Sequence, residues 1–278
     1  MSKNAKVIYN GELLDADSGS SLLFNRGFLY GDGFFESMRF ERNKILRFDL
    51  HYKRILENMQ LLKMESENFP YASALEKMIL DLTQANSIAN YSRVRLNIFR
   101  ESSGAYTPDE NKASYFISCT ALDSALAFPV NGLHIGIYDL QKKAAGPFSG
   151  VKSLSSQFYV MAGIYAKENG WEEVLVMNTE GKFIEALSSN IFYVKNNMLC
   201  TPPISDGCVN GVFRKYILSV LDKNGIECKE ESFYPDDISQ VSEIFMCNAI
   251  KGIQWVEILD GKKFGNEMAR RVFDLIVK

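Results

Sequence analysis

Four segments of the chain carry residues whose types and spacing could bind a phosphate or support a reaction. The first, Gly31-Asp32-Gly33, begins like a dinucleotide-binding fingerprint, but Glu36 stands at the third glycine position and no helix follows. A tight turn before a strand at 34–40 is therefore favoured. The second, residues 146–153, resembles a phosphate loop, but its length is wrong and Lys152 does not directly follow a glycine. A nucleotide hydrolase is disfavoured, and Lys152 taken alone is compatible with a surface lysine.

The other two segments are polar loops. Residues 185–190 end a strand and offer hydroxyl and amide groups, which bind either an anion or nearby turn backbone. Residues 206–212 open a helix, and the free N–H groups and positive dipole end of a helix N-terminus suit a phosphate. Most helix N-termini bind nothing, so neither loop identifies a reaction by itself.

Composition narrows the class of protein. The 278 residues correspond to roughly two domains, and the net charge of −3 disfavours a general nucleic-acid binder without excluding small anions. Five cysteines without a C-x-x-C pair and only two histidines disfavour a disulfide framework or a metal site. The N-terminus has no apolar leader and no apolar run approaches ~18 residues, so a cytoplasmic protein without a membrane partner is expected.

The first half of the chain predicts mixed strands and helices. Residues 36–48 are typical of a hairpin that turns at Arg42-Asn43-Lys44, and Asp49 is a candidate N-cap for the next helix. Residues 92–100 alternate apolar and polar side chains, which predicts a half-buried strand with a basic face, and residues 115–120 predict another strand. Apolar residues recur at helical spacing in two segments: Tyr52, Ile55, Leu56, Met59 and Leu62, and then Leu75, Met78, Ile79 and Leu82.

The second half is richer in strands. Weak periodicity with Pro129 predicts an α+β domain over 1–122, a linker over 123–131 and a strand-rich domain over 132–278. Strands are expected at 134–138, 173–177, 182–185, 190–195, 243–248 and 253–258, and helices at 156–169, at 212–223 and from 264. Because this order is no regular βαβ alternation, an α+β fold is favoured over a doubly wound one.

Together and in order, these segments resemble a known family. FNRGFLYGDGFFESMRF at 24–40 resembles the N-terminal signature of the class IV (fold-type IV) pyridoxal-phosphate enzymes. That family includes branched-chain aminotransferases, D-amino-acid aminotransferases and 4-amino-4-deoxychorismate lyases. The further matching segments are HYKRILENMQLL, VRLNIFR, GVKS, EALSSNIFYV, TPPISDGCVNGVFRKYIL and FMCNAIKGIQWV. The resemblance covers residues 8–257 and implies a two-domain fold like that of the D-amino-acid aminotransferases, with pyridoxal 5'-phosphate between the domains.

The resemblance also implies roles for single residues. Lys152 would form the Schiff base with the cofactor and move the substrate proton, since lysine is a nucleophile that can be unprotonated near neutral pH. Glu185 would face the pyridine nitrogen and keep it protonated. Arg54 would hold the cofactor phosphate with a charge-assisted fork. Gly211 and Val212 would add backbone N–H groups to that phosphate.

Other cofactor contacts are less complete. Asn248 and Ala249 stand where the family places its second phosphate-binding loop. Many relatives carry hydroxyl residues at the positions of Phe213 and Ala249, so Asn248 or the loop residues Ser188, Ser189 and Asn190 are expected to compensate. The cofactor-facing tyrosine that branched-chain enzymes carry shortly after the lysine has no clear counterpart here.

The substrate contacts expected from the resemblance are Tyr30, Glu36, Ser37 and Arg95. Arg95 aligns with an arginine that binds a substrate carboxylate in branched-chain enzymes, and Arg93 shares its strand face. Surface charge on an exposed strand face explains the two arginines equally well. A small amino or carboxylate substrate follows from the resemblance, as does a homodimer.

Two reactions remain open. The hydroxyl of Ser37, the NAIKGI segment and the short chain favour 4-amino-4-deoxychorismate lyase, which releases pyruvate and leaves 4-aminobenzoate for folate synthesis. A branched-chain or D-amino-acid aminotransferase is the alternative, and a non-catalytic cofactor-binding relative is the remote one.

Overall fold

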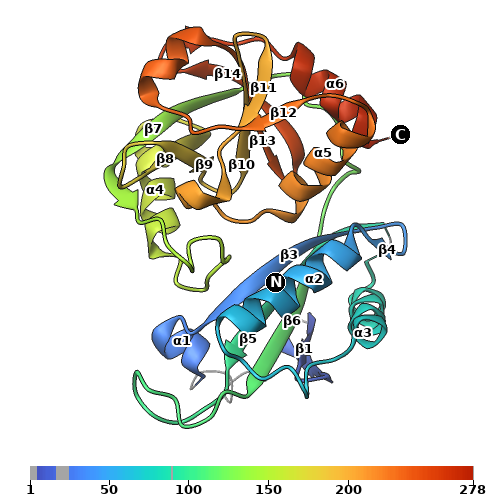
Figure 1. Cartoon of the computed structure of the whole chain (residues 1–278). Coiled ribbons are helices and arrows are strands. Elements are labelled where there is room, and N and C mark those ends of the chain that lie inside the picture. Colours follow the sequence, from blue (N-terminus) through green and yellow to red (C-terminus); the bar gives the residue numbers. More distant parts are fainter. Residues whose placement is uncertain (1–4, 17–24, 89, 278) are drawn as a thin grey trace. The chain divides into compact units, whose positions relative to one another are not determined.

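The computed structural model describes residues 5–16, 25–88 and 90–277. Two parts of the segments discussed above lie outside the described residues. They are residues 1–4 at the N-terminus and Phe24, which opens the 24–40 signature. The chain divides into two compact units, Met1–Ala125 with Lys152–Ser156 and Leu126–Val151 with Gln157–Lys278 (Figure 1). The segment that begins with Lys152 therefore belongs to the first unit, although the chain on either side of it belongs to the second.

The first unit is built on an antiparallel sheet with the strand order β2-β1-β6-β5-β3-β4. The strands are β1 (Lys6–Tyr9), β2 (Glu12–Asp15), β3 (Gly33–Glu41), β4 (Lys44–Ile45), β5 (Tyr91–Arg100) and β6 (Ala113–Ala121). The alternation predicted for residues 92–100 is correct, because Val94, Leu96 and Ile98 are fully buried on one face of β5. Ser37 of β3 lies directly across from Arg95 of β5 in this register.

Three α-helices in the described part of the first unit accompany this sheet. They are α1 (Arg26–Tyr30), α2 (Phe48–Leu61) and α3 (Ala72–Ala85). Helix α2 packs against β3, and α3 packs against β1 and β6 (Figure 1). Leu75, Ile79 and Leu82 of α3 are fully buried, as their helical spacing predicts. These helices pack on the sheet and complete the apolar core of the first unit.

The start and the buried face of α2 differ from the sequence expectation. Asp49 is not the N-cap, because Arg47 occupies that position and Asp49 lies in the first turn, where its charge suits the helix dipole. Leu56 is 39% exposed, whereas His51 and Arg54 are buried. Polar residues take this face because they contact a carboxylate of β3.

The second unit contains a nine-stranded mixed sheet with the order β12-β11-β10-β13-β14-β7-β8-β9, and β15 pairs with β14. Its strands are β7 (Leu133–Lys143), β8 (Glu173–Asn178), β9 (Phe183–Ala186), β10 (Asn190–Lys195), β11 (Met198–Thr201), β12 (Cys228–Glu230), β13 (Val241–Asn248), β14 (Gly252–Leu259) and β15 (Lys262–Lys263). The β14–β7, β7–β8 and β11–β12 pairs are parallel. The expected strand-rich α+β architecture is thus confirmed, whereas β1, β2, β11, β12 and β15 were not predicted.

Apolar side chains cover both faces of this sheet. Ile191 and Tyr193 of β10 belong to one buried cluster, whereas Phe192 and Val194 belong to a second cluster that includes helices α5 (Val212–Lys223) and α6 (Glu267–Ile276). Helix α4 (Gln157–Glu168) packs against β7 and β8 (Figure 1). Two short 3₁₀ helices, Ile204–Asp206 and Pro235–Gln240, complete the unit. Burial on both faces holds the loops at the strand ends, which carry most of the expected cofactor contacts.

Candidate functional site

Lys152 is held against β3 by backbone pairing. The amide of Phe35 donates to the carbonyl of Lys152 over 2.9 Å, and the amide of Leu154 donates to the carbonyl of Gly33 over 3.0 Å. Phe34 and Ser153 form a β-bridge between these two bonds. The Lys152 ammonium lies 4.5 Å from the centre of the Phe35 ring. The segment 152–154 therefore pairs with β3 as a short additional strand, which places the Lys152 amine beside the Phe35 ring.

Arg95 reaches the same ring from β5. Its guanidinium carbon lies 3.7 Å from the centre of the Phe35 ring, so the side chains of Arg95 and Lys152 are both neighbours of Phe35. Arg95 Nε donates to Asn97, and Arg93 donates to the hydroxyl of Ser37 over 3.4 Å. Burial and the charge of Arg93 lower the pKa of Arg95. Two like charges crowd one strand face here.

No described carboxylate forms an ion pair with Arg93 or Arg95. An arginine keeps its charge at physiological pH, so an anion bound beside Arg95 would offset the charge of the two guanidinium groups, of which that of Arg93 is exposed. This face can therefore bind a carboxylate, with the amine of Lys152 beside it. The sequence had left substrate binding and surface charge open for these arginines, and their binding of a substrate stays a prediction.

A buried ion cluster joins β3 to α2. Arg54 donates from Nε to Glu36 Oε1 over 2.7 Å and from Nη2 to Glu36 Oε2 over 2.6 Å. His51 Nδ1 lies 2.7 Å from Glu36 Oε2. Burial alone would raise the pKa of the Glu36 carboxyl, but the Arg54 charge and the His51 contact outweigh it and lower that pKa to about 2. Glu36 is therefore an ionised carboxylate with no exposed surface, and it binds Arg54 through Nε and Nη2, so the phosphate contact expected of Arg54 stays a prediction.

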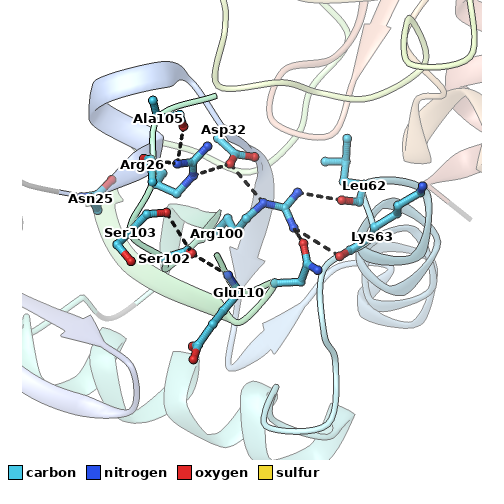
Figure 2. Close-up of polar contacts among 12 residues, drawn as sticks. Asn25, Arg26, Asp32, Leu62, Lys63, Arg100, Ser102, Ser103, Ala105 and Glu110 are labelled. Carbon is cyan, nitrogen blue, oxygen red and sulfur yellow. Dashed lines mark hydrogen bonds and ion pairs between the residues drawn. The ribbon is translucent and has the colours of Figure 1, made fainter. Parts of the chain in front are cut away.

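Gly31-Asp32-Gly33 forms the tight turn that the sequence favoured. Gly31 ends α1 with a φ of +65°, a conformation that suits glycine. Asp32 Oδ2 accepts from Arg26 Nε over 2.8 Å and from Arg100 Nε over 3.1 Å (Figure 2). Arg26 also donates to the carbonyl of Ala105, and Arg100 donates to that of Leu62. Asp32 thus ties the β5–β6 connection to α1 and to the end of α2.

Tyr30 lies on α1 and is 42% exposed. Its ring is 4.8 Å from the Arg26 guanidinium and 5.9 Å from the centre of the Tyr106 ring. Within the first unit, none of the recorded contacts of Tyr30 involves Lys152 or Arg95. Its role in substrate binding stays a prediction.

In the second unit, Glu185 of β9 is a carboxylate with 3% exposure. Its Oε1 accepts from the ammonium of Lys143 over 2.9 Å and from the hydroxyl of Tyr159 over 2.7 Å. Its Oε2 accepts from the amide of Val209 over 2.9 Å. A carboxylate oxygen accepts about two hydrogen bonds, so Oε1 is saturated and Oε2 has room for one more donor.

The loop before α5 is shaped by Asn190. Asn190 Nδ2 donates to the carbonyl of Val209 over 2.8 Å, and a Cβ on Gly211 would lie 1.9 Å from Asn190 Oδ1. The amide of Gly211 donates to the carbonyl of Val209, so it is already used within the loop. Val212 is the first residue of α5, and no side chain caps this helix. Of the two backbone N–H groups expected to bind the phosphate, that of Gly211 is already bonded, whereas that of Val212 belongs to the first turn of α5.

A second loop cluster surrounds Asn248. Its Oδ1 accepts from the amides of Ile250 and Lys251, and its Nδ2 donates to the hydroxyl of Ser189 over 3.0 Å. The side chain of Asn248 is therefore committed to the turn that contains Ala249. Because Ser189 Oγ accepts from Asn248, its own proton remains a donor.

Ser188 belongs to the same loop as Ser189 but bonds in another direction. Its hydroxyl donates to Glu173 Oε2 over 3.3 Å. Burial raises the pKa of the Glu173 carboxyl, whose Oε1 is buried without a described partner. The hydroxyl of Ser188 is thus engaged inside the second unit.

Sequence reasoning missed His51, Lys143 and Tyr159. A signal for His51 was available in the sequence. His51 and Arg54 are polar residues three positions apart on one helix face, and a buried helix face seldom carries such a pair. Lys143 and Tyr159 are linked to Glu185 by tertiary contacts alone. No spacing in the sequence reveals such contacts.

Two further classes of site receive no support from the described part of the chain. Within residues 5–16, 25–88 and 90–277, no cluster of three or more His, Cys, Asp or Glu side chains could hold a metal ion. Among the same residues, no helix is both long enough and apolar enough to cross a membrane.

Comparison with known proteins shows which family carries these features. The model of the family "Amino-transferase class IV" matches residues 33–258, which is most of the chain. The chain belongs to the class IV aminotransferase family. Members of this family bind pyridoxal 5'-phosphate. The resemblance found in the sequence is thereby confirmed, and the chain is an enzyme of this family.

Individual relatives carry different activities. A D-alanine aminotransferase of Bacillus licheniformis is 23% identical over 271 residues, which cover 94% of this chain and 90% of the relative. The branched-chain amino acid aminotransferase of Thermobaculum terrenum, in its pyridoxal-phosphate form, has a TM-score of 0.86 at 20% identity, covering 99% of this chain and 93% of that one. A Legionella pneumophila protein provisionally named a 4-amino-4-deoxychorismate lyase has a TM-score of 0.81 at 20% identity, covering 91% and 92%. These structures confirm the fold-type IV fold.

Proposed function

We propose that this chain is a pyridoxal 5'-phosphate-dependent aminotransferase that acts on an α-amino acid of the branched-chain or D-amino-acid class. The observation that carries the proposal is the pair Arg93 and Arg95, which lack a described carboxylate partner and lie on the strand face beside Phe35 and Lys152. An α-amino acid brings the carboxylate that this face needs. The curated relatives with this activity support the same class.

The residues present fit the cofactor. Glu185 Oε2 has room for one more donor, which suits a protonated pyridine nitrogen. The first amides of α5 and the hydroxyl of Ser189 are donors suited to a phosphate. Lys152 supplies the amine that would bond to the cofactor. When bound, pyridoxal phosphate supplies an electron-withdrawing ring that stabilises negative charge at the substrate α-carbon.

Each residue then has a distinct task. Lys152 Nζ removes the α-proton of the substrate and returns it to another carbon, so it must exchange between charged and neutral forms. Arg95 holds the substrate carboxylate, and Arg93 and Ser37 support it from the same strand pair. Glu36 fixes the guanidinium of Arg54 through Nε and Nη2, and Arg54 would in turn hold the cofactor phosphate. Glu36 is thus a positioning residue in this proposal, and Tyr30 has no assigned contact.

The lyase reaction is the second candidate. Its main support in the sequence is the hydroxyl of Ser37, which in the structure accepts from Arg93 and so serves the same carboxylate face. This contact fits a carboxylate substrate of either reaction. The named aminotransferase relatives make the transfer reaction the better supported one.

Cofactor capture is the first test of the proposal. Purified protein mixed with pyridoxal 5'-phosphate is expected to gain a visible absorbance band, and borohydride should fix the cofactor mass on the Lys152 peptide. Lys152→Ala should bind no cofactor covalently yet stay folded, because it keeps the backbone hydrogen bonds between this segment and β3. A wild-type protein that takes up no cofactor would contradict the proposal.

Substrate assays separate the reactions. L-leucine or D-alanine with a 2-oxo acid should give the exchanged amino acid, whereas 4-aminobenzoate and pyruvate from aminodeoxychorismate would establish the lyase instead. Arg95→Gln should raise KM for the carboxylate substrate by about tenfold or more with a smaller change in kcat, because a bidentate contact is lost. Arg271→Gln, on an exposed face of α6, is the matched control and should leave KM unchanged.

A further inference from the structure

Glu185 is a carboxyl group with almost no access to water. A buried carboxylate is stable as an anion only when a positive charge or several hydrogen bonds compensate for its lost hydration. Lys143 is the cation recorded against it, with its ammonium 2.9 Å from Oε1. The role of Glu185 toward the cofactor requires the ionised form, so the residue that keeps it ionised matters for the reaction.

Lys143 connects three parts of the second unit. Besides Glu185 on β9, its ammonium donates to the hydroxyl of Tyr159 on α4 and to the carbonyl of Ser149, each over 2.9 Å. Ser149 stands three residues before Lys152 in the loop that delivers this lysine. All three donors of the ammonium are thereby used, so its position is fixed from three sides.

We propose that Lys143 is a positioning residue for the reaction: it keeps Glu185 ionised, turns Oε2 rather than Oε1 toward the cofactor, and anchors the loop that precedes Lys152. The proposal rests on the proposed function, because it concerns the same cofactor. It adds a residue that none of the family signatures quoted above contains. Lys143 acts through Glu185 and the loop and touches neither substrate nor cofactor.

The other titratable groups around Glu185 cannot replace this cation. Burial and the Glu185 charge hold the pKa of Tyr159 far above its usual value, so its hydroxyl stays a neutral donor. Burial, followed by the Glu185 charge, raises the pKa of Cys208 to about 12, so this thiol also stays neutral. Lys143 on β7 is thus the group that supplies positive charge from the elements packed against Glu185.

The test compares Lys143→Met with Lys143→Arg and with Lys142→Met, in which the neighbouring exposed lysine is changed. In the cofactor-loaded protein, Lys143→Met is expected to lower kcat by about tenfold or more with less than a threefold change in KM. The absorbance titration of the bound cofactor should shift its midpoint upward by about one pH unit, because a ring without its ionised partner no longer disfavours a proton on the Lys152 nitrogen. Lys143→Arg should restore most of both properties.

Failure of the two proposals is distinguishable. If wild type binds no cofactor, the proposed function fails. If wild type binds it and Lys143→Met matches Lys142→Met in kcat and in the titration midpoint, the role of Lys143 is refuted.

A double variant covers the case in which Lys143→Met does not fold. Lys143→Met/Glu185→Gln buries no unbalanced charge and should fold. If Lys143 acts on the cofactor through Glu185, the double variant should share the titration midpoint of Glu185→Gln. A midpoint that differs between these two variants by about one pH unit would contradict action through Glu185.

Discussion

Glu36 and Glu185 are two strand carboxylates that are buried with different partners. Glu36 is paired with the guanidinium of Arg54 and with His51, whereas Glu185 is paired with the ammonium of Lys143 and the hydroxyl of Tyr159. Both partner sets compensate a buried carboxylate for its lost hydration, and at Glu36 they lower the pKa of the carboxyl to about 2. At the scale of residues, the chemistry of this protein therefore depends on the cations that accompany its carboxylates.

Glu36→Gln is expected to destabilise the fold. It leaves Arg54 as a buried charge without its carboxylate, and such a loss typically costs about 3–5 kcal/mol in the free energy of unfolding. Urea unfolding at pH 7 measures this loss. Asp81→Asn is the matched control, because Asp81 pairs with Lys77 on an exposed helix face and should cost less than about 1 kcal/mol.

The same carboxylate sets a pH dependence. Since the pKa of Glu36 is lowered from 4.5 to about 2, its ionisation stabilises the folded state above pH 4.5, and this contribution is lost as the pH falls from 4.5 toward 2. The difference in stability between wild type and Glu36→Gln should therefore shrink over that range. A difference that stays constant from pH 5 to pH 2.5 would contradict the pairing.

At the scale of elements, short loops position the candidate residues by close backbone approach. The loop before α5 fits around Asn190, which leaves no room for a Cβ at Gly211. The turn after β13 fits around Asn248 in the same way, through two amides that bond to one side-chain oxygen. Each asparagine thus fixes the shape of one loop through its side-chain hydrogen bonds.

Gly211→Ala is expected to displace this loop. The added Cβ would lie 1.9 Å from Asn190 Oδ1, so either the loop or the asparagine must move. Equilibrium binding of pyridoxal 5'-phosphate should weaken by about tenfold or more, since one lost hydrogen bond to a charged group is worth about 1.5–3 kcal/mol. Gly265→Ala is the control, because its Cβ would meet only ordinary contacts at 3.6 Å or beyond, and binding should be unchanged.

At the scale of the whole molecule, the chain leaves the second unit at Lys152 and re-enters it at Gln157. This excursion brings Lys152 to the sheet of the first unit, while the loop before Lys152 stays bonded in the second unit through Gly150 and Asn210. The covalent path of the chain thus gives Lys152 to the first unit and leaves Gly150 and Asn210 in the second.

Leu154→Pro is expected to loosen this excursion. Proline lacks the amide that bonds to the carbonyl of Gly33, so the strand-like pairing with β3 loses one of its two bonds. The amide of Phe35, which bonds to the carbonyl of Lys152, should then exchange with solvent about tenfold faster. Leu154→Met keeps the amide and should leave this exchange unchanged. Equal exchange in the two variants would show that the pairing does not hold the segment.

The amino-acid sequence by itself determined much of this protein. Periodicity predicted α3, α4, α5 and the main strands, because the local spacing of apolar residues indicates which face of an element is buried. The ordered family segments identified Lys152, Glu185 and Arg54 as the residues to examine, and the family is confirmed.

Only the tertiary structure decided which charges meet. Three features depend on how residues separated in the chain meet in space. Arg54 binds Glu36, Glu185 binds Lys143, and Arg93 and Arg95 lack a described carboxylate. Ion pairs form by proximity in space and leave no periodic trace in a sequence, whereas apolar burial does. The elements could therefore be predicted from local pattern, but the electrostatics of the candidate site could not.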